Sequence, residues 1–198
     1  ETLLLDDFAF RAATEFIDAP ANQDIEIGVA GPNSASVEDA LAVIPVRLTA
    51  GETYVAVANG VLSPNDFAEN PDGEDTGFQL LVKPMAREMA MDDSKVEFTI
   101  LHGSTDAPTV DVLANDAVEL ANDLPYGMFT DYLAVDPAAY VVNLYDETRS
   151  TNVVNFDVDL SGLAGGAAVV FASGFLAPEN NQDGPAFGLL AALPNGTV

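Results

Sequence analysis

The sequence contains no cysteine, no tryptophan and a single histidine, and only six of its 198 residues are Lys or Arg. Without cysteine the chain forms neither disulfides nor thiolate zinc sites, so the redox argument for a cellular compartment does not apply. Asp and Glu number 32, which gives a formal net charge of −26. This charge repels nucleic-acid phosphates and anionic membrane surfaces, so we expect no nucleic-acid partner.

Long apolar runs are also missing. No run approaches the ~18 residues that a membrane-spanning helix needs, so we predict no transmembrane segment. The start of the sequence does not resemble a signal peptide, and we expect any export signal to have been removed. Hydrophobic residues make up 48% of the chain, which is ample for a folded core. The acidity then has two interpretations, a solvated coat on a secreted or salt-exposed protein and a calcium-dependent surface.

Three segments recur in the same order along the chain. VANGVLSP at 57–64 returns as FASGFLAP at 171–178, and NPDGEDTGFQLLV at 70–82 returns as NNQDGPAFGLLAA at 180–192. More loosely, DFAFRAATEFIDAP at 7–20 returns as DLPYGMFTDYLAVDP at 123–137. Repeats in constant order indicate duplication. We therefore predict a first module at 1–83, a linker at 84–94 and a second module at 95–198.

Apolar and polar residues alternate with period two along most of the chain. Ile25 to Val29, Val96 to His102 and Val154 to Leu160 each place apolar side chains on one face, as half-buried antiparallel strands require. Short strands separated by Pro, Gly, Asn and Asp are typical of sandwiches. We predict an all-β fold of two tandem antiparallel β-sandwich (immunoglobulin-like) modules. Ser34 to Ala42 adds at most a short helical turn, with Ser36 as its cap and Asp39 at N3.

The segment HGSTDAPTVDVLAND at 102–116 resembles the secreted family known as domain of unknown function 4397. Its His-x-Ser-x-Asp-Ala-Pro turn and Val-Asp-Val strand match the family in place, and ALPNGT at 192–197 resembles the closing strand. The resemblance covers the second module and the first from about Leu3. It implies an all-β module, often in tandem, on extracellular or cell-surface proteins, and it supplies no established activity.

The first module departs from this pattern at its start. The opening strands at 95–115 have no counterpart, because ETLLLDDFAF already corresponds to the stretch near 118–126. A sandwich that lacks strands exposes unpaired backbone and apolar side chains. We expect an interface here, formed by Leu3, Leu5, Phe8 and Phe10. Two explanations stay open, a strand donated by another chain and upstream strands that were cleaved or left out.

His102 is the only histidine, so any histidine-based catalysis must use it. Ser104 and Asp106 are close in sequence, but neighbours on one turn seldom place a nucleophile, a base and an orienting group correctly. Ser104 does not lie in a Gly-x-Ser-x-Gly elbow. We expect His102 to close a strand while Ser104 and Asp106 satisfy backbone donors. The expected protein is therefore not an enzyme.

Two acidic loops offer the oxygen ligands that calcium prefers. The candidate ligands are Asp66, Glu69, Asp72 and Asp75 in the first loop and Asp183 in the second. Neither loop has EF-hand spacing, because Ala68 and Gln79 fall at the first and twelfth positions when Gly73 is placed at the sixth. A solvated turn and a calcium site are both consistent with these residues. Apart from calcium we expect no cofactor.

The sequence points to a non-enzymatic extracellular or cell-surface protein with a structural or adhesive role, such as a filament or surface-layer subunit completed by β-strand donation. We expect a protein partner, through self-association or another surface protein. The alternative is a calcium- or carbohydrate-binding module, although carbohydrate platforms usually present exposed aromatics and the chain has no Trp and five Tyr.

Met85, Met89 and Met91 of the linker form either an adaptable docking surface or a packed connection. Asn195 begins a glycosylation sequon.

Overall fold

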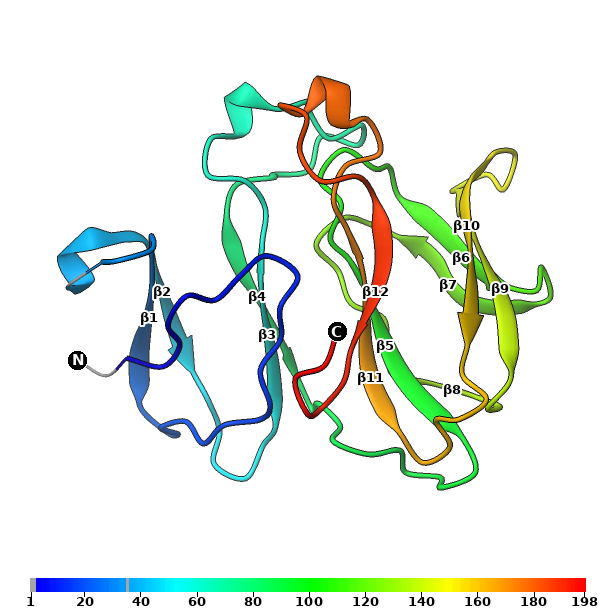
Figure 1. Cartoon of the computed structure of the whole chain (residues 1–198), viewed down its shortest axis with the longest axis horizontal. Helices are drawn as coiled ribbons and strands as arrows, with labels where there is room; N and C mark the ends of the chain where they lie inside the picture. Colours follow the sequence, from blue (N-terminus) through cyan, green and yellow to red (C-terminus); the bar gives the residue numbers. More distant parts are fainter. Residues whose placement is uncertain (1–2, 35) are drawn as a thin grey trace.

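The chain is all-β, as its periodicity predicts. The computed structural model describes residues 3–34 and 36–198, and within them it contains β-strands, three short 3-10 turns and no α-helix (Figure 1). It follows that no helix in this part of the chain is long and apolar enough to span a membrane.

The N-terminal part, residues 3–84, contains two antiparallel hairpins. The first joins β1 (Asp24–Ala30) to β2 (Ala40–Arg47), and the second joins β3 (Tyr54–Asn59) to β4 (Gln79–Pro84). Each hairpin is a separate two-stranded sheet. The 3-10 turn η1 (Val37–Asp39) precedes β2, and η2 (Pro64–Asp66) follows β3. Ser36 accepts a hydrogen bond from the Glu38 N–H at 3.2 Å, so it begins the short turn predicted there.

The C-terminal part, residues 95–198, contains two four-stranded sheets, with strand orders β10-β9-β6-β7 and β12-β11-β5-β8. Its elements are β5 (Val96–His102), β6 (Val110–Ala114), β7 (Val118–Leu124), β8 (Leu133–Val135), β9 (Ala139–Asp146), β10 (Asn152–Asp159), β11 (Ala167–Ser173), η3 (Pro178–Asn180) and β12 (Gly188–Ala192).

One strand pairing differs from the antiparallel arrangement that the sequence predicts. β5 pairs with β11 in parallel, Ala167 lying opposite Glu97 and Ala172 opposite His102. A hairpin turn fixes the direction of neighbouring strands, but β5 and β11 are separated by most of the C-terminal part. Hairpin geometry therefore does not set their relative direction.

The hydrophobic core lies between the two four-stranded sheets. Twelve buried side chains form it, six of them on β5 and β6 (Val96, Phe98, Ile100, Val110, Val112 and Ala114). Among the described residues, every buried hydrophobic side chain lies at or after Ala90. The inward side chains of β1 and β2 are only half-buried. The N-terminal part therefore has an alternating pattern but an incomplete core.

The β3–β4 hairpin lies between β1–β2 and the sheet that contains β11, so the two parts of the chain are side by side (Figure 1). Direct hydrogen bonds join them. Arg11 donates to the carbonyl oxygens of Ser173 at 2.7 Å and Ala186 at 2.8 Å, and Asn59 donates to the Tyr126 hydroxyl at 2.9 Å. β5 is buried on both faces, where the sequence predicts one exposed face.

The connection between the parts is packed through small and basic residues. Ala90 is buried and its N–H donates to Gly165 O at 2.9 Å, while Arg87 pairs with buried Glu97. Met85, Met89 and Met91 are exposed. The methionines therefore do not supply the packing of this connection.

Candidate interaction site

The turn after β5 forms hydrogen bonds with loops from both parts of the chain. Asp106 accepts hydrogen bonds from the backbone N–H groups of Leu176 and Ala177, each at 2.9 Å, and from the Asn181 side chain at 2.9 Å. Ser104 donates from its hydroxyl to Gly174 O at 2.7 Å. The sequence predicts that these side chains satisfy donors within their own turn, but Asp106 serves donors about seventy residues away, at the η3 loop.

Two buried asparagines complete this connection. Asn181 accepts from the Ala68 N–H at 3.0 Å, and Asn70 donates to the carbonyl oxygens of Thr105 at 3.0 Å and Ala107 at 3.2 Å. Both asparagines start an Asn-x-x-Gly turn in the recurring loop. Buried amides that satisfy backbone groups on neighbouring segments hold those segments in one arrangement. The cluster is a structural connection between the repeated loops.

His102 is buried beneath this turn. Its Nε2 lies 2.9 Å from Pro108 O, so this nitrogen carries the proton and donates it. Within the described residues, its Nδ1 is one of two buried side-chain polar atoms that have no hydrogen-bond partner. Desolvation lowers the pKa of His102, and the hydrogen bond to Pro108 only partly opposes this effect. The histidine is therefore neutral at physiological pH and occupies the end of β5, as predicted.

The candidate calcium ligands are spread along the surface of their loops. Asp72 accepts from the Thr109 N–H at 2.6 Å, and Asp75 accepts from the Gly77 N–H at 2.9 Å. Asp66, Glu69 and Asp183 are exposed. Across residues 3–34 and 36–198, no three His, Asp or Glu side chains come together in an arrangement that could hold a metal ion. Two of the five carboxylates thus serve the backbone of turns.

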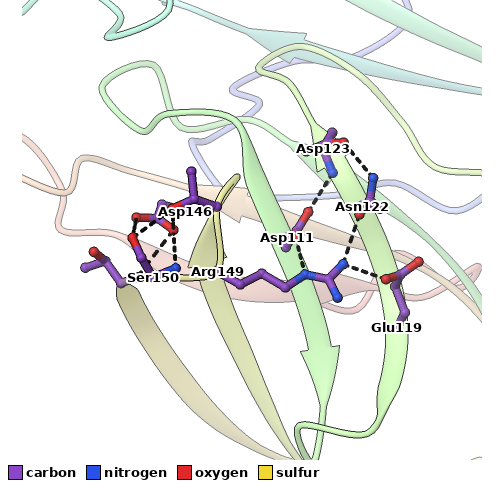
Figure 2. Close-up of polar contacts among 9 residues, drawn as sticks. Asp111, Glu119, Asn122, Asp123, Asp146, Arg149 and Ser150 are labelled. Carbon is purple, nitrogen blue, oxygen red and sulfur yellow. Dashed lines mark hydrogen bonds and ion pairs between the residues drawn. The ribbon is translucent and has the colours of Figure 1, made fainter.

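A polar cluster that the sequence does not single out lies on the other sheet (Figure 2). The buried Asp111 pairs with Arg149, which also pairs with Glu119 and donates to Asn122 at 2.9 Å. Asp111 accepts in addition from the Asp123 N–H at 2.7 Å. The pKa of Arg149 is raised, chiefly by its bond to Asp111. The one signal in the sequence is Asp111 itself, a carboxylate inside an otherwise apolar strand.

The tip of the β9–β10 hairpin positions Arg149 for this contact. Asp146 accepts hydrogen bonds from the backbone N–H of Ser150 at 2.8 Å and from the Thr148 hydroxyl at 3.0 Å (Figure 2). Desolvation raises the pKa of Asp146, but these hydrogen bonds outweigh it and the net pKa is lowered. The ionised carboxylate therefore closes the turn that presents Arg149 to β6 and β7.

The predicted interface residues are exposed. Leu3, Leu5, Phe8 and Phe10 are 75%, 43%, 49% and 63% accessible, and no strand pairs with them among the described residues. Several exposed apolar side chains gathered in one short segment are unusual on the surface of a monomer. The Arg11 guanidinium lies 5.0 Å from the Phe10 ring and anchors the end of the segment to the C-terminal part.

The C-terminal part contains an apolar cavity of about 510 Å³ that is partly open to solvent. Core side chains of β5 and β6 line it, and His102 lies at its wall. Phe156 of β10 and Phe187 beside β12 are only half-buried, so the cavity is less well covered at this edge than at β7.

One family model matches a segment within the C-terminal part of the chain. Residues 96–184 match the model of a family described as Domain of unknown function (DUF4397). The match runs from the start of β5 to the turn after η3, and it includes the turn that carries His102, Ser104 and Asp106. A search of curated proteins and a search of solved structures each found no match.

Proposed function

We propose that this chain, in which residues 96–184 form a domain of the DUF4397 family, is a non-enzymatic structural or adhesive protein of the cell surface. Its subunits associate by β-strand donation, and residues 3–84 are an incomplete copy of the module formed by residues 95–198. The single observation that carries this proposal is the pair of two-stranded sheets in the N-terminal part, whose inward side chains stay half-buried.

The energetics of an unfinished sandwich favour association. Burying one apolar side chain contributes roughly 1.5–3 kcal/mol, so a strand with four inward residues offers about 6–12 kcal/mol before ordering costs. Strand addition also satisfies a row of backbone groups at the sheet edge. These terms are large enough to hold subunits together in a filament or a surface layer.

The hydrogen bonds of the polar residues in the turn after β5 support a structural role. His102, Ser104 and Asp106 each bind a backbone group of the protein itself. The chain carries 32 acidic residues against six basic ones, and most of the acidic residues lie on the surface. An acidic coat of this kind keeps a secreted or salt-exposed protein soluble. These features support a location outside the cell.

The proposal is tested by removing the exposed apolar segment. We expect replacement of Leu3, Leu5, Phe8 and Phe10 by Ser to shift the protein from assemblies to single chains in light scattering, because the contact area is lost. Replacement of Met85, Met89 and Met91 by Ser is the matched control, since these apolar side chains are also exposed, in a different segment of the chain. Assemblies that survive the first set of substitutions would contradict the proposal.

The cavity of about 510 Å³ favours a second candidate function, the binding of an apolar small molecule. A cavity lined mainly by aliphatic side chains suits a lipid or an isoprenoid better than a sugar. The fluorescent probe N-phenyl-1-naphthylamine should then bind at saturation, and Ala168→Phe, which fills the cavity from β11, should abolish the signal. A signal that rises without saturation, or that Ala168→Phe leaves unchanged, would exclude this function.

A further inference from the structure

The two parts of the chain correspond in their backbone at several matched positions. Asp7 and Asp123 both have positive φ, at 48° and 50°, and four residues later Arg11 and Gly127 do so again, at 59° and 79°. Positive φ is uncommon for residues other than glycine, so two matches at equal spacing fix the alignment. The segment at 3–8 is thereby the counterpart of β7.

The hairpins correspond in the same way. Gly60 and Gly174 have positive φ at the ends of β3 and β11, and each is followed by an isolated parallel bridge, Val61 to Gly77 and Phe175 to Ala186. β3 and β4 therefore correspond to β11 and β12. By their order in the chain, β1 and β2 correspond to β9 and β10. This alignment identifies which strands have no counterpart.

Two of the strands without a strand counterpart, β5 and β6, are central ones. β5 lies between β11 and β8, and β6 lies between β9 and β7. In the N-terminal part, β3 pairs only with β4 and β1 pairs only with β2. The second edge of β3 and the second edge of β1 are the positions that β5 and β6 occupy in the other copy. Among the described residues no strand pairs with either edge.

The exposure of equivalent side chains reflects this difference. On β7 the three inward residues are buried against the core (Leu120, Ala121 and Leu124). Their counterparts at the start of the chain are largely exposed (Leu4, Leu5 and Phe8). Ala56 and Ala58 of β3 are exposed on the inward face as well, where Val170 and Ala172 of β11 face the core. Equivalent positions are therefore exposed in the N-terminal part and buried in the C-terminal part, because no central strand covers them in the N-terminal part.

We propose that the N-terminal part binds a β-hairpin of the β5–β6 type, donated by a second chain. This inference rests on the proposed function and specifies the partner. The first strand of the hairpin runs parallel to β3, and the second inserts antiparallel between β1 and residues 3–8, as β5 and β6 do in the complete copy. The donor therefore carries alternating apolar residues on both strands, as at Val96, Phe98 and Ile100.

The hairpin at 95–115 of the same chain cannot serve both copies. Its six inward side chains are half of the buried core of the C-terminal part, and its turn binds the η3 loop through Asp106. Withdrawing it would unfold the complete copy in order to finish the incomplete one. A donor hairpin on another polypeptide avoids this exchange and leaves the C-terminal core of the chain intact.

A synthetic peptide of residues 95–115 is a direct probe of this site. We expect saturable binding of one peptide per chain by titration calorimetry, together with slowed hydrogen exchange of the amides of β1 and β3. A peptide with Phe98→Asp and Val112→Asp is the control, because both changes fall on the inward face. It should not bind, since a carboxylate would enter the core.

Two protein variants locate the bound peptide. Leu5→Asp should weaken peptide binding by about tenfold or more, because Leu5 would face the inserted strand. Leu41→Asp changes another exposed leucine, which lies on the outer face of β2, and should leave binding unchanged. Equal effects of the two substitutions would overturn the proposal.

The remaining outcomes separate this inference from the proposed function. Assemblies that form normally in a protein that does not bind the peptide would show association through another surface, which overturns the inference and leaves the proposed function standing. Single chains isolated from the source cells, with the β1 and β3 amides already protected, would show a hairpin supplied by the same polypeptide. That result overturns both this inference and the proposed function.

Discussion

At the scale of single residues, the polar side chains of the turn after β5 bind backbone groups that are distant in sequence. Asp106 satisfies three donors in and beside the η3 loop, and it reaches them from a turn that is about seventy residues away along the chain. Such contacts contribute to stability mainly through the cost of leaving buried donors unpaired. The residues that resemble an active site in sequence therefore have a measurable structural role.

Replacing Asp106 with Ala should lower the free energy of unfolding by roughly 2–4 kcal/mol, because the N–H groups of Leu176 and Ala177 lose their acceptor. Urea denaturation measures the change. Asp131→Ala, at an exposed position, is the control and should change stability by less than about 0.5 kcal/mol. Equal stability of the two variants would show that Asp106 does not fasten the loops.

His102 should make the fold sensitive to mild acid. Burial lowers its pKa in the folded state below the ordinary value of 6.5, so the unfolded chain takes up a proton at higher pH than the folded one. The contribution of the neutral ring is therefore complete above pH 6.5 and is lost as the pH falls toward the lowered value. His102→Gln should be less stable than the parent at neutral pH, and the difference should shrink on acidification. A difference that is constant from pH 7.5 to 5 would contradict this.

At the scale of elements, the same strand pattern gives a closed core in one part and an open one in the other. The consequence is a difference in mutational cost. Ile100→Ala on β5 removes a buried side chain and should cost about 2–5 kcal/mol, whereas Ile27→Ala on half-buried β1 should cost about 1 kcal/mol. Thermal unfolding of both variants measures this. The loss of stability caused by Ile27→Ala should increase when the partner hairpin is bound. If Ile27→Ala and Ile100→Ala destabilise the single chain equally, the core of the N-terminal part is already closed.

Period-two patterning was sufficient to predict the strands at Ile25, Val96 and Val154. The capping residues Ser36 and Asp39 predicted a short helical turn, which the structure forms as the 3-10 turn η1. It could not give the parallel pairing of β5 with β11, because no local turn connects them. Nor could it give the burial of Glu97, which depends on Arg87 folding back from the connection. The ion pair of Asp111 with Arg149 is equally non-local. The exposed apolar segment was predictable because it follows from comparing the first ten residues with the repeated stretch near 118–126.

At the scale of the whole molecule, charge is the dominant feature. The 32 carboxylates face six basic residues, and each basic side chain is already engaged, four of them in ion pairs (Arg47, Arg87, Lys95 and Arg149). Arg11 binds carbonyl oxygens, and Lys83 lies 5.8 Å from the Phe129 ring. The remaining acidic groups repel one another, and the repulsion is screened only by ions from solution.

The melting temperature should therefore rise with sodium chloride between 0.05 and 2 M, because screening removes repulsion that is stronger in the compact state. A variant with exposed Asp and Glu residues replaced by Asn and Gln serves as the comparison and should show a shallower rise. Differential scanning calorimetry measures both slopes. A flat profile for the parent protein would contradict this interpretation of the acidic surface.

Sedimentation velocity on the protein isolated from its source cells, in high salt and over a range of concentrations, tests the central claim most directly. Strand donation into the open N-terminal part predicts species heavier than one chain, which persist on dilution and dissociate only when the fold itself is denatured. A single species with the mass of one chain at every concentration would contradict the account.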